Sequence, residues 1–215
     1  KKILKKKLNI FIGYQLRFHP GIKIIKETIK KKKLGNLISG NLYFGEYLPL
    51  MHSYEDYSKT HMAIKKKGGG VVSCLSHTID LFLYLIGKPD KIYSITSKNS
   101  LLQIDVEDDL QAILTYKNKA NLLLHMNFLT YPPQHFMILN FQNGTVNWNY
   151  FNKDLTIYFN KTRKKKYYKF NDLDRSEMFN EQIKDFIKLK SKRICSFKES
   201  IDTLKIIHKL KNNVI

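Results

Sequence analysis

The sequence contains little cysteine and no long hydrophobic run. Its two cysteines, Cys74 and Cys195, lie far apart in a chain of 215 residues. They do not make a disulfide framework, so we expect a reducing, cytoplasmic location. No apolar run approaches the roughly 20 residues of a membrane-spanning helix, and no signal-type apolar stretch follows the basic residues 1–7. We therefore expect no membrane association.

Arginine is also scarce, although the chain is strongly basic. Only four of the 38 basic residues are arginine, and the formal net charge is +20. Nucleic-acid readers favour arginine, whose planar fork fits guanine and phosphate. Here lysine accompanies many Ile, Asn, Tyr and Phe residues, all with A/T-rich codons. This pattern favours compositional drift first and an anionic small ligand second, so we do not expect a nucleic-acid partner.

The glycine fingerprint of dinucleotide-binding domains is missing. No Gly-x-Gly-x-x-Gly occurs, and Gly68-Gly69-Gly70 does not replace it, because it lacks a preceding strand and a spaced third glycine. The histidines and cysteines show no metal-ligand spacing either. We therefore predict no cofactor-binding and no metal-binding residues in this chain.

The order of the predicted elements indicates the fold class. Residues 2–7 are typical of a helix end, and 8–13 of a short buried strand with parallel neighbours. A helix from Pro20, a strand at 37–47, a loop at 50–67 and an apolar helix at 71–86 follow. Strands are then expected at 91–96, 109–116, 120–129, 135–142, 145–150, 154–159 and 167–170. Two helices, at 174–190 and 198–212, end the chain. This order predicts an α+β fold, with a large, mostly antiparallel open sheet and helices packed on one face.

The densest group of chemically capable residues runs from Gly68 to Asp80. The glycines allow close backbone approach to a bulky group and leave free N–H groups at the helix start. His77 and Asp80 are three residues apart and share one helix face. A histidine in apolar surroundings is either a general acid/base for a hydroxyl or a core residue satisfied by Asp80 or a backbone carbonyl.

Several motifs occur in an order that resembles one enzyme family. They are Gly13-Tyr14-Gln15-Leu16-Arg17-Phe18-His19-Pro20, Leu34-Gly35-Asn36-Leu37-Ile38, Gly45-Glu46-Tyr47-Leu48-Pro49, Tyr54-Glu55-Asp56-Tyr57, the segment Gly68–Asp80, Leu85-Ile86-Gly87, Asp105-Val106-Glu107-Asp108 and Asn143-Gly144-Thr145. Together they resemble the glucose–fructose oxidoreductase, inositol dehydrogenase and rhizopine-catabolism (Gfo/Idh/MocA) family. The likeness is greatest to the branch acting on amino sugars or nucleotide sugars for surface glycans.

The resemblance implies two parts of the chain. Residues 1–13 would be the remnant of an N-terminal NAD- or NADP-binding Rossmann domain, and residues 14–215 the substrate-binding and dimerisation domain. The family's glycine fingerprint and its Glu-Lys-Pro motif with the catalytic lysine would lie upstream. Neither is present, so this chain alone is expected to be inactive and to bind the dinucleotide poorly. A homo-oligomer through the sheet face is also implied.

Carried over by position, His77 matches the family's catalytic histidine, which exchanges a proton with the substrate hydroxyl. Tyr14 and Arg17 would line the sugar pocket; packing for Tyr14 and an ion pair for Arg17 are the alternatives. Tyr57, with Tyr54, lies in a loop that either closes over the sugar or is simply surface. Asp80 is predicted at the pocket, orienting His77 or capping structure.

The residues just before His77 depart from the family pattern. Many members carry an acidic residue three or four positions before the histidine, where this chain has Ser73 and Cys74. A carboxylate there would help to hold or tune the histidine. The alternative to a sugar oxidoreductase is therefore a non-enzymatic remnant or sugar-binding module, and a basic nucleic-acid-binding domain is a more distant one.

Overall fold

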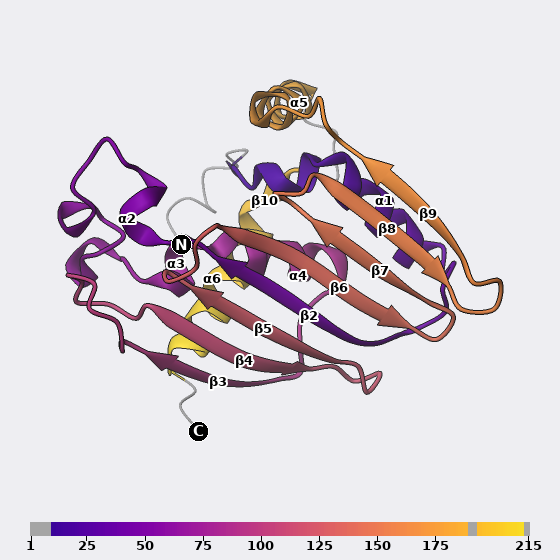
Figure 1. Ribbon diagram of the computed structural model, residues 1–215, viewed down its shortest axis with the longest axis horizontal. Coiled ribbons are helices and arrows are strands. Elements are labelled where there is room, and N and C mark those ends of the chain that lie inside the picture. Colours follow the sequence, from indigo (N-terminus) through magenta and orange to yellow (C-terminus); the bar gives the residue numbers. More distant parts are fainter. Residues whose placement is uncertain (1–9, 189–192, 213–215) are drawn as a thin grey trace.

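The computed structural model describes residues 10–188 and 193–212. Its main feature is one eight-stranded sheet in the order β3-β4-β5-β2-β6-β7-β8-β9. The strands are β2 (Leu37–Gly45), β3 (Lys91–Ser97), β4 (Asp109–Thr115), β5 (Asn121–Asn127), β6 (Gln134–Phe141), β7 (Gly144–Asn149), β8 (Asp154–Phe159) and β9 (Lys164–Lys169). All neighbours are antiparallel except β2 and β5, which are parallel. Figure 1 shows β2 at the centre of the sheet.

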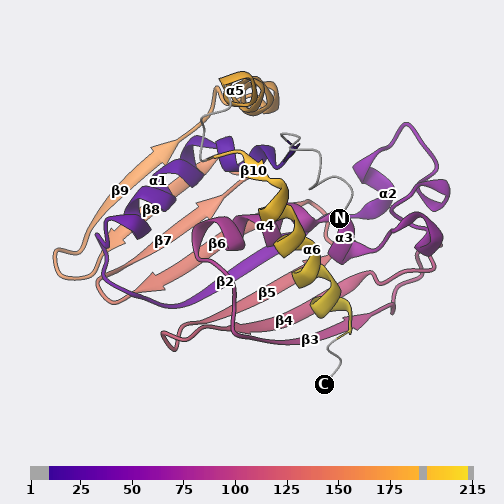
Figure 2. The same cartoon turned by 180° about the vertical axis from the view of Figure 1, so that it is seen from behind.

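Helices cover one face of this sheet, as Figure 2 shows from behind. They are α1 (Pro20–Lys30), α4 (Ser76–Leu85) and α6 (Phe197–Asn212), while α5 (Arg175–Lys188) lies beyond the edge of the sheet. The remaining helices are short: the 3-10 helices η2 (Gln15–Phe18), η3 (Tyr57–Lys59) and η4 (Lys65–Lys67), and the single-turn α-helices α2 (Leu48–Met51) and α3 (Val71–Cys74). The α+β fold with a large, mostly antiparallel sheet and helices on one face is confirmed.

The alternation of side chains explains why the sheet has one buried face. In β4, Leu110, Ala112 and Leu114 are buried, while Gln111 and Ile113 between them are exposed. A strand points successive side chains to opposite faces, so one row meets the helices and the other meets solvent. Burial of the inner row beneath the helices forms the core of the protein.

Two elements differ from the predictions. The apolar segment 71–86 forms not one helix but two, α3 and α4, which meet at Leu75 with a bend of 48° between the flanking segments. Strand β9 begins at Lys164 rather than at 167 and is exposed along nearly its whole length. It is an edge strand, where lysines discourage pairing with another chain, so its sequence lacks the alternation that reveals inner strands.

The strand predicted at 8–13 also differs in its partner. Its described part is β1 (Phe11–Ile12), which pairs antiparallel with β10 (Cys195–Ser196) rather than with parallel neighbours. The predicted helix end at 2–7 and the remainder of the proposed Rossmann remnant, up to residue 9, lie outside the described residues. The division of the chain at residue 13 stays a prediction.

No single helix in the described ranges is long and apolar enough to cross a membrane, and one bent pair, Lys65–Cys74 with Ser76–Leu85, passes by length and composition only.

Candidate functional site

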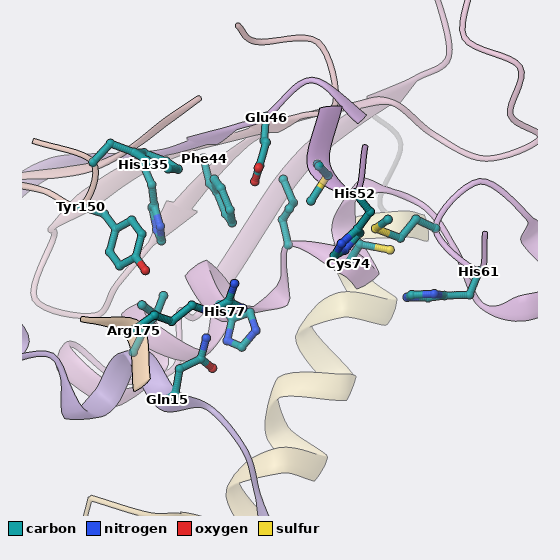
Figure 3. Close-up of a pocket in the computed structure, with 15 residues that line it drawn as sticks. Gln15, Phe44, Glu46, His52, His61, Cys74, His77, His135, Tyr150 and Arg175 are labelled. Carbon is teal, nitrogen blue, oxygen red and sulfur yellow. The ribbon is translucent and has the colours of Figure 1, made fainter. Parts of the chain in front are cut away.

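A cavity of about 330 Å³ lies beside the break between α3 and α4. Its walls come from η2, β2, β6, the loop after β2, and the first residue of α5. Figure 3 shows its polar and ionisable lining, which includes Gln15, Glu46, His52, His61, His77 and Arg175. Titratable side chains from segments far apart in the sequence therefore line the cavity beside the helix break.

His77 lines this cavity from the first turn of α4. Its Nδ1 atom is buried and has no hydrogen-bond partner among the described residues. The Tyr14 ring meets the imidazole edge-on, with 5.4 Å between the ring centroids. Burial, together with a smaller effect of the positive charge of Arg175, lowers the pKa of His77 to about 4. The imidazole is therefore neutral at physiological pH and able to accept a proton.

A second histidine supports the cavity from the sheet. His135 of β6 stacks on Phe44 of β2, with ring centroids 4.3 Å apart, and its Nε2 is hydrogen-bonded to the Thr78 hydroxyl at 3.2 Å. Complete burial lowers the pKa of His135 to about 3. Because Thr78 follows His77 in α4, this bond ties the start of the helix to the sheet. We assign His135 a positioning role.

Glu46 and Arg175 give the cavity charged groups of both signs. Burial raises the pKa of the Glu46 carboxyl, while His52 and Arg175 act in the opposite direction. Arg175 is the first residue of α5 and reaches the cavity beside Tyr150 and His77 (Figure 3). Glu46 and Arg175 were not singled out in the sequence, because neither lies in a local motif with His77.

Two of the three glycines before α3, Gly69 and Gly70, lie close against other groups of the chain, whereas a side chain at Gly68 would meet open space. A side chain at Gly70, which has φ 104°, would overlap the Glu107 carboxylate, and one at Gly69 would overlap the backbone of His61 and Met62. The N–H groups of residues 68–71 all donate to backbone carbonyls, and that of residue 72 donates to the Glu107 carboxylate. The expectation of free N–H groups at this helix start is wrong.

Arg17 and Asp80 are paired with each other instead of facing the cavity. The Arg17 Nε and Nη2 atoms donate to the two Asp80 carboxylate oxygens at 2.8 and 2.7 Å, and the side chains are 2% and 1% exposed. Burial alone would lower the pKa of Arg17, but the bonds to Asp80 hold it above its usual value. Both Asp80 oxygens are thus engaged by arginine, so this geometry gives Asp80 no direct hold on His77.

The predicted tyrosines have different settings. Tyr14 touches the His77 ring, as described above, and burial raises the pKa of its hydroxyl. Tyr57 accepts a hydrogen bond from the Gln103 backbone N–H at 3.2 Å and so links two loops. Of the four predicted sugar-binding residues, Tyr14 alone contacts His77 in the interactions described, and a direct substrate contact for each stays a prediction.

The chain shows no cradle for a dinucleotide in its described part. The only glycine-rich turn before a helix is closed by Glu107, so a pyrophosphate would find no free N–H groups there. Within residues 10–188 and 193–212, no group of three or more His, Cys, Asp or Glu is arranged to hold a metal ion.

Comparison with known structures supports the fold. An NAD-binding oxidoreductase from Klebsiella pneumoniae superposes with a TM-score of 0.82 at 11% identity, covering 98% of this chain and 65% of the other. Levoglucosan dehydrogenase in complex with NADH and levoglucosan gives 0.81 at 14% identity, with coverages of 94% and 63%. UDP-N-acetylglucosamine 3-dehydrogenase GnnA from Acidithiobacillus ferrooxidans gives 0.73 at 18%, with 98% and 63%.

The present chain therefore spans less than two thirds of the length of these structures. No curated protein sequence matches it. The family model described as the GFO/IDH/MocA C-terminal domain matches residues 22–147, which is more than half of the chain. This chain belongs to the GFO/IDH/MocA family, within its C-terminal domain.

Proposed function

We propose that the cavity around His77 binds a sugar, and that the complete protein oxidises a hydroxyl group of that sugar with NAD or NADP, or reduces the corresponding ketone with the reduced cofactor. The observation that carries the proposal is a neutral imidazole beside a cavity of about 330 Å³ in a chain of this family. The GnnA and levoglucosan dehydrogenase likenesses support a sugar, amino sugar or nucleotide sugar as substrate. A role in surface-glycan synthesis is part of the same proposal.

His77 would perform the proton half of the reaction. When an alcohol becomes a ketone, the carbon loses a hydride and the oxygen loses a proton. A nicotinamide cofactor would supply the hydride acceptor. Because burial lowers the pKa of His77 to about 4, its imidazole is unprotonated at neutral pH and can accept the proton. In the reverse direction the resulting imidazolium returns it.

The test uses the complete reading frame that contains this chain. Reduction of NAD and NADP would be followed with a panel of neutral, amino and nucleotide sugars. His77→Asn should lower kcat by about 10²–10⁴-fold, the usual contribution of a general acid/base. His208→Asn, an exposed histidine of α6, is the matched control and should leave kcat unchanged. Equal rates for wild type and His77→Asn would refute the proton role.

A second candidate is sugar binding without chemistry. Cys74 lines the cavity, in the region where many relatives carry an acidic residue, and burial raises the pKa of its thiol to about 11. A neutral thiol cannot stabilise an imidazolium as a carboxylate does. Sugar binding that persists without any NAD(P)-dependent turnover of the complete protein would favour this candidate.

A second copy of the chain is the proposed partner for the open face of the sheet. This face exposes Tyr93, Ile95, Ile113 and Leu123 at 42%, 56%, 45% and 53%. Apolar side chains grouped on one surface favour association. Sedimentation of the wild type and of a Leu123→Lys variant tests this: a dimer that the substitution dissociates would support it, and a monomeric wild type would contradict it.

A further inference from the structure

Arg175 differs from the other arginines that contact the body of the protein. Arg17 is held by Asp80, and Arg193 by Asp185 at 2.8 and 2.9 Å. Around Arg175, no carboxylate of the described residues lies within ion-pairing distance. The contact found for its guanidinium is the Phe179 ring, 5.8 Å from the centroid. Its five N–H donors are therefore available for a ligand.

The carboxylate that precedes Arg175 in the chain is already engaged. The Asp174 carboxylate accepts a hydrogen bond from the Ser176 hydroxyl, and the Asp174 carbonyl accepts one from the Glu177 backbone N–H. Asp174 thus caps the start of α5 instead of pairing with the guanidinium. The Arg175 side chain is left facing the cavity, between Tyr150 and His77 (Figure 3).

The charges around the cavity favour an anion. Glu46 is the one carboxyl group among the described residues of the lining, and burial raises its pKa. His77 and His135 are held neutral by the same burial. The full positive charge of Arg175 is therefore opposed by a single carboxylate that does not pair with it.

We infer that Arg175 binds an acidic group of the substrate, a carboxylate or a phosphate, so that this cavity selects acidic sugars over neutral ones. The planar guanidinium can make two parallel hydrogen bonds to either group, which fixes orientation as well as affinity. Anchored there, the sugar would present a hydroxyl to His77 on the same side of the cavity. This inference rests on the proposed function, because it assumes that the sugar occupies this cavity.

The experiment compares three matched hexoses: neutral D-glucose, D-glucuronate with a carboxylate, and D-glucose 1-phosphate with a phosphate. Calorimetric titration of the complete protein measures each Kd for the wild type, for Arg175→Gln and for Arg163→Gln. Arg163 lies at the exposed turn between β8 and β9, so its replacement removes the same charge outside the cavity. Both variants replace exposed side chains and should keep the native circular dichroism spectrum.

We expect at least one acidic hexose to bind the wild type about tenfold or more tightly than glucose, a preference of about 1.4 kcal/mol. Arg175→Gln should abolish this preference, and Arg163→Gln should retain it; the better of the two acids identifies carboxylate or phosphate. Equal binding of all three hexoses, binding of none, or equal losses in both variants would overturn the inference.

The proton role of His77 and the anion site at Arg175 can be refuted independently of each other. A kcat that falls in His77→Asn, together with an acid preference that survives in Arg175→Gln, would leave the proton role of His77 intact and remove the anion site. If the acid preference depends on Arg175 but His77→Asn does not change kcat, the anion site stands and the proton role of His77 is refuted.

Discussion

Replacement of Asp80 by asparagine should destabilise the protein strongly, because Arg17 would remain buried with its main countercharge gone. The pair is buried on both sides, with side-chain exposures of 2% and 1%. Removing one partner of a buried ion pair costs about 3–5 kcal/mol. Glu199 still accepts from the Arg17 Nη1 atom at 3.0 Å, so we expect the lower end, about 3 kcal/mol. The introduced amide would also turn its own N–H donors toward the guanidinium donors.

The assay is urea unfolding together with the thermal midpoint. For a domain of this size each kcal/mol lowers Tm by about 2–4 °C, so Asp80→Asn should lower it by about 6–12 °C. Lys184→Met, which breaks an exposed pair with Glu181, should change the free energy of unfolding by less than about 1 kcal/mol. The double variant Arg17→Met with Asp80→Leu should recover most of the loss, because it removes both charges.

If Asp80→Asn costs no more than Lys184→Met, the ion pair does not anchor α4 to η2, and the reasoning from burial is refuted. A loss that the double variant fails to recover would also contradict it, because the cost would then come from shape and not from the uncompensated charge.

Two further predictions concern pH and the glycine turn. Burial lowers the pKa of His19 to about 4 and of His135 to about 3, so the unfolded chain takes up these protons first as the pH falls. The free energy of unfolding should therefore decrease between about pH 6.5 and pH 4, by about 1.4 kcal/mol per pH unit for each histidine. His19→Asn, which can still cap α1, should reduce the slope of urea-derived stability against pH by that amount, and an unchanged slope would contradict it. At the turn, Gly70→Ala should lower Tm much more than Gly68→Ala: both have positive φ, but only at Gly70 would the methyl group overlap Glu107. Equal losses in calorimetry would show that close approach to Glu107 does not matter.

The strands of the fold were predictable from local patterns. Short apolar runs mark β4 and β5, Asn118-Lys119 marks the turn between them, and Asn143-Gly144 marks the turn between β6 and β7. Their order in the sheet was not predictable in this way. Strand β2 pairs with β5 and β6, which are distant in sequence, and no local signal specifies such partners. The helix break at Leu75 was not predictable either, because no proline or glycine lies there.

The candidate site was only partly predictable for the same reason. His77 lies in a dense local motif, and the structure places it at the cavity. Arg17 and Asp80 were both singled out, yet their mutual bond spans 63 positions, which spacing along one helix cannot reveal. His135 and Arg175 reach His77 from β6 and α5, and each is an isolated residue in its own segment. The local sequence around His135 or Arg175 therefore does not indicate that the fold brings either side chain to the cavity.

The central place of β2 has a consequence for synthesis of the chain. Leu37–Gly45 leaves the ribosome early, but both strands that flank it end only with Asn127 and Phe141. At translation rates of about 5–20 residues per second, the wait for both neighbours lasts about 5–20 s. Until Asn127 has been added β2 has two unpaired edges, and until Phe141 it has one, each able to hydrogen-bond with another nascent copy. The time spent on the ribosome, more than the final stability, is thus the stage at which this sheet is most exposed to misassembly.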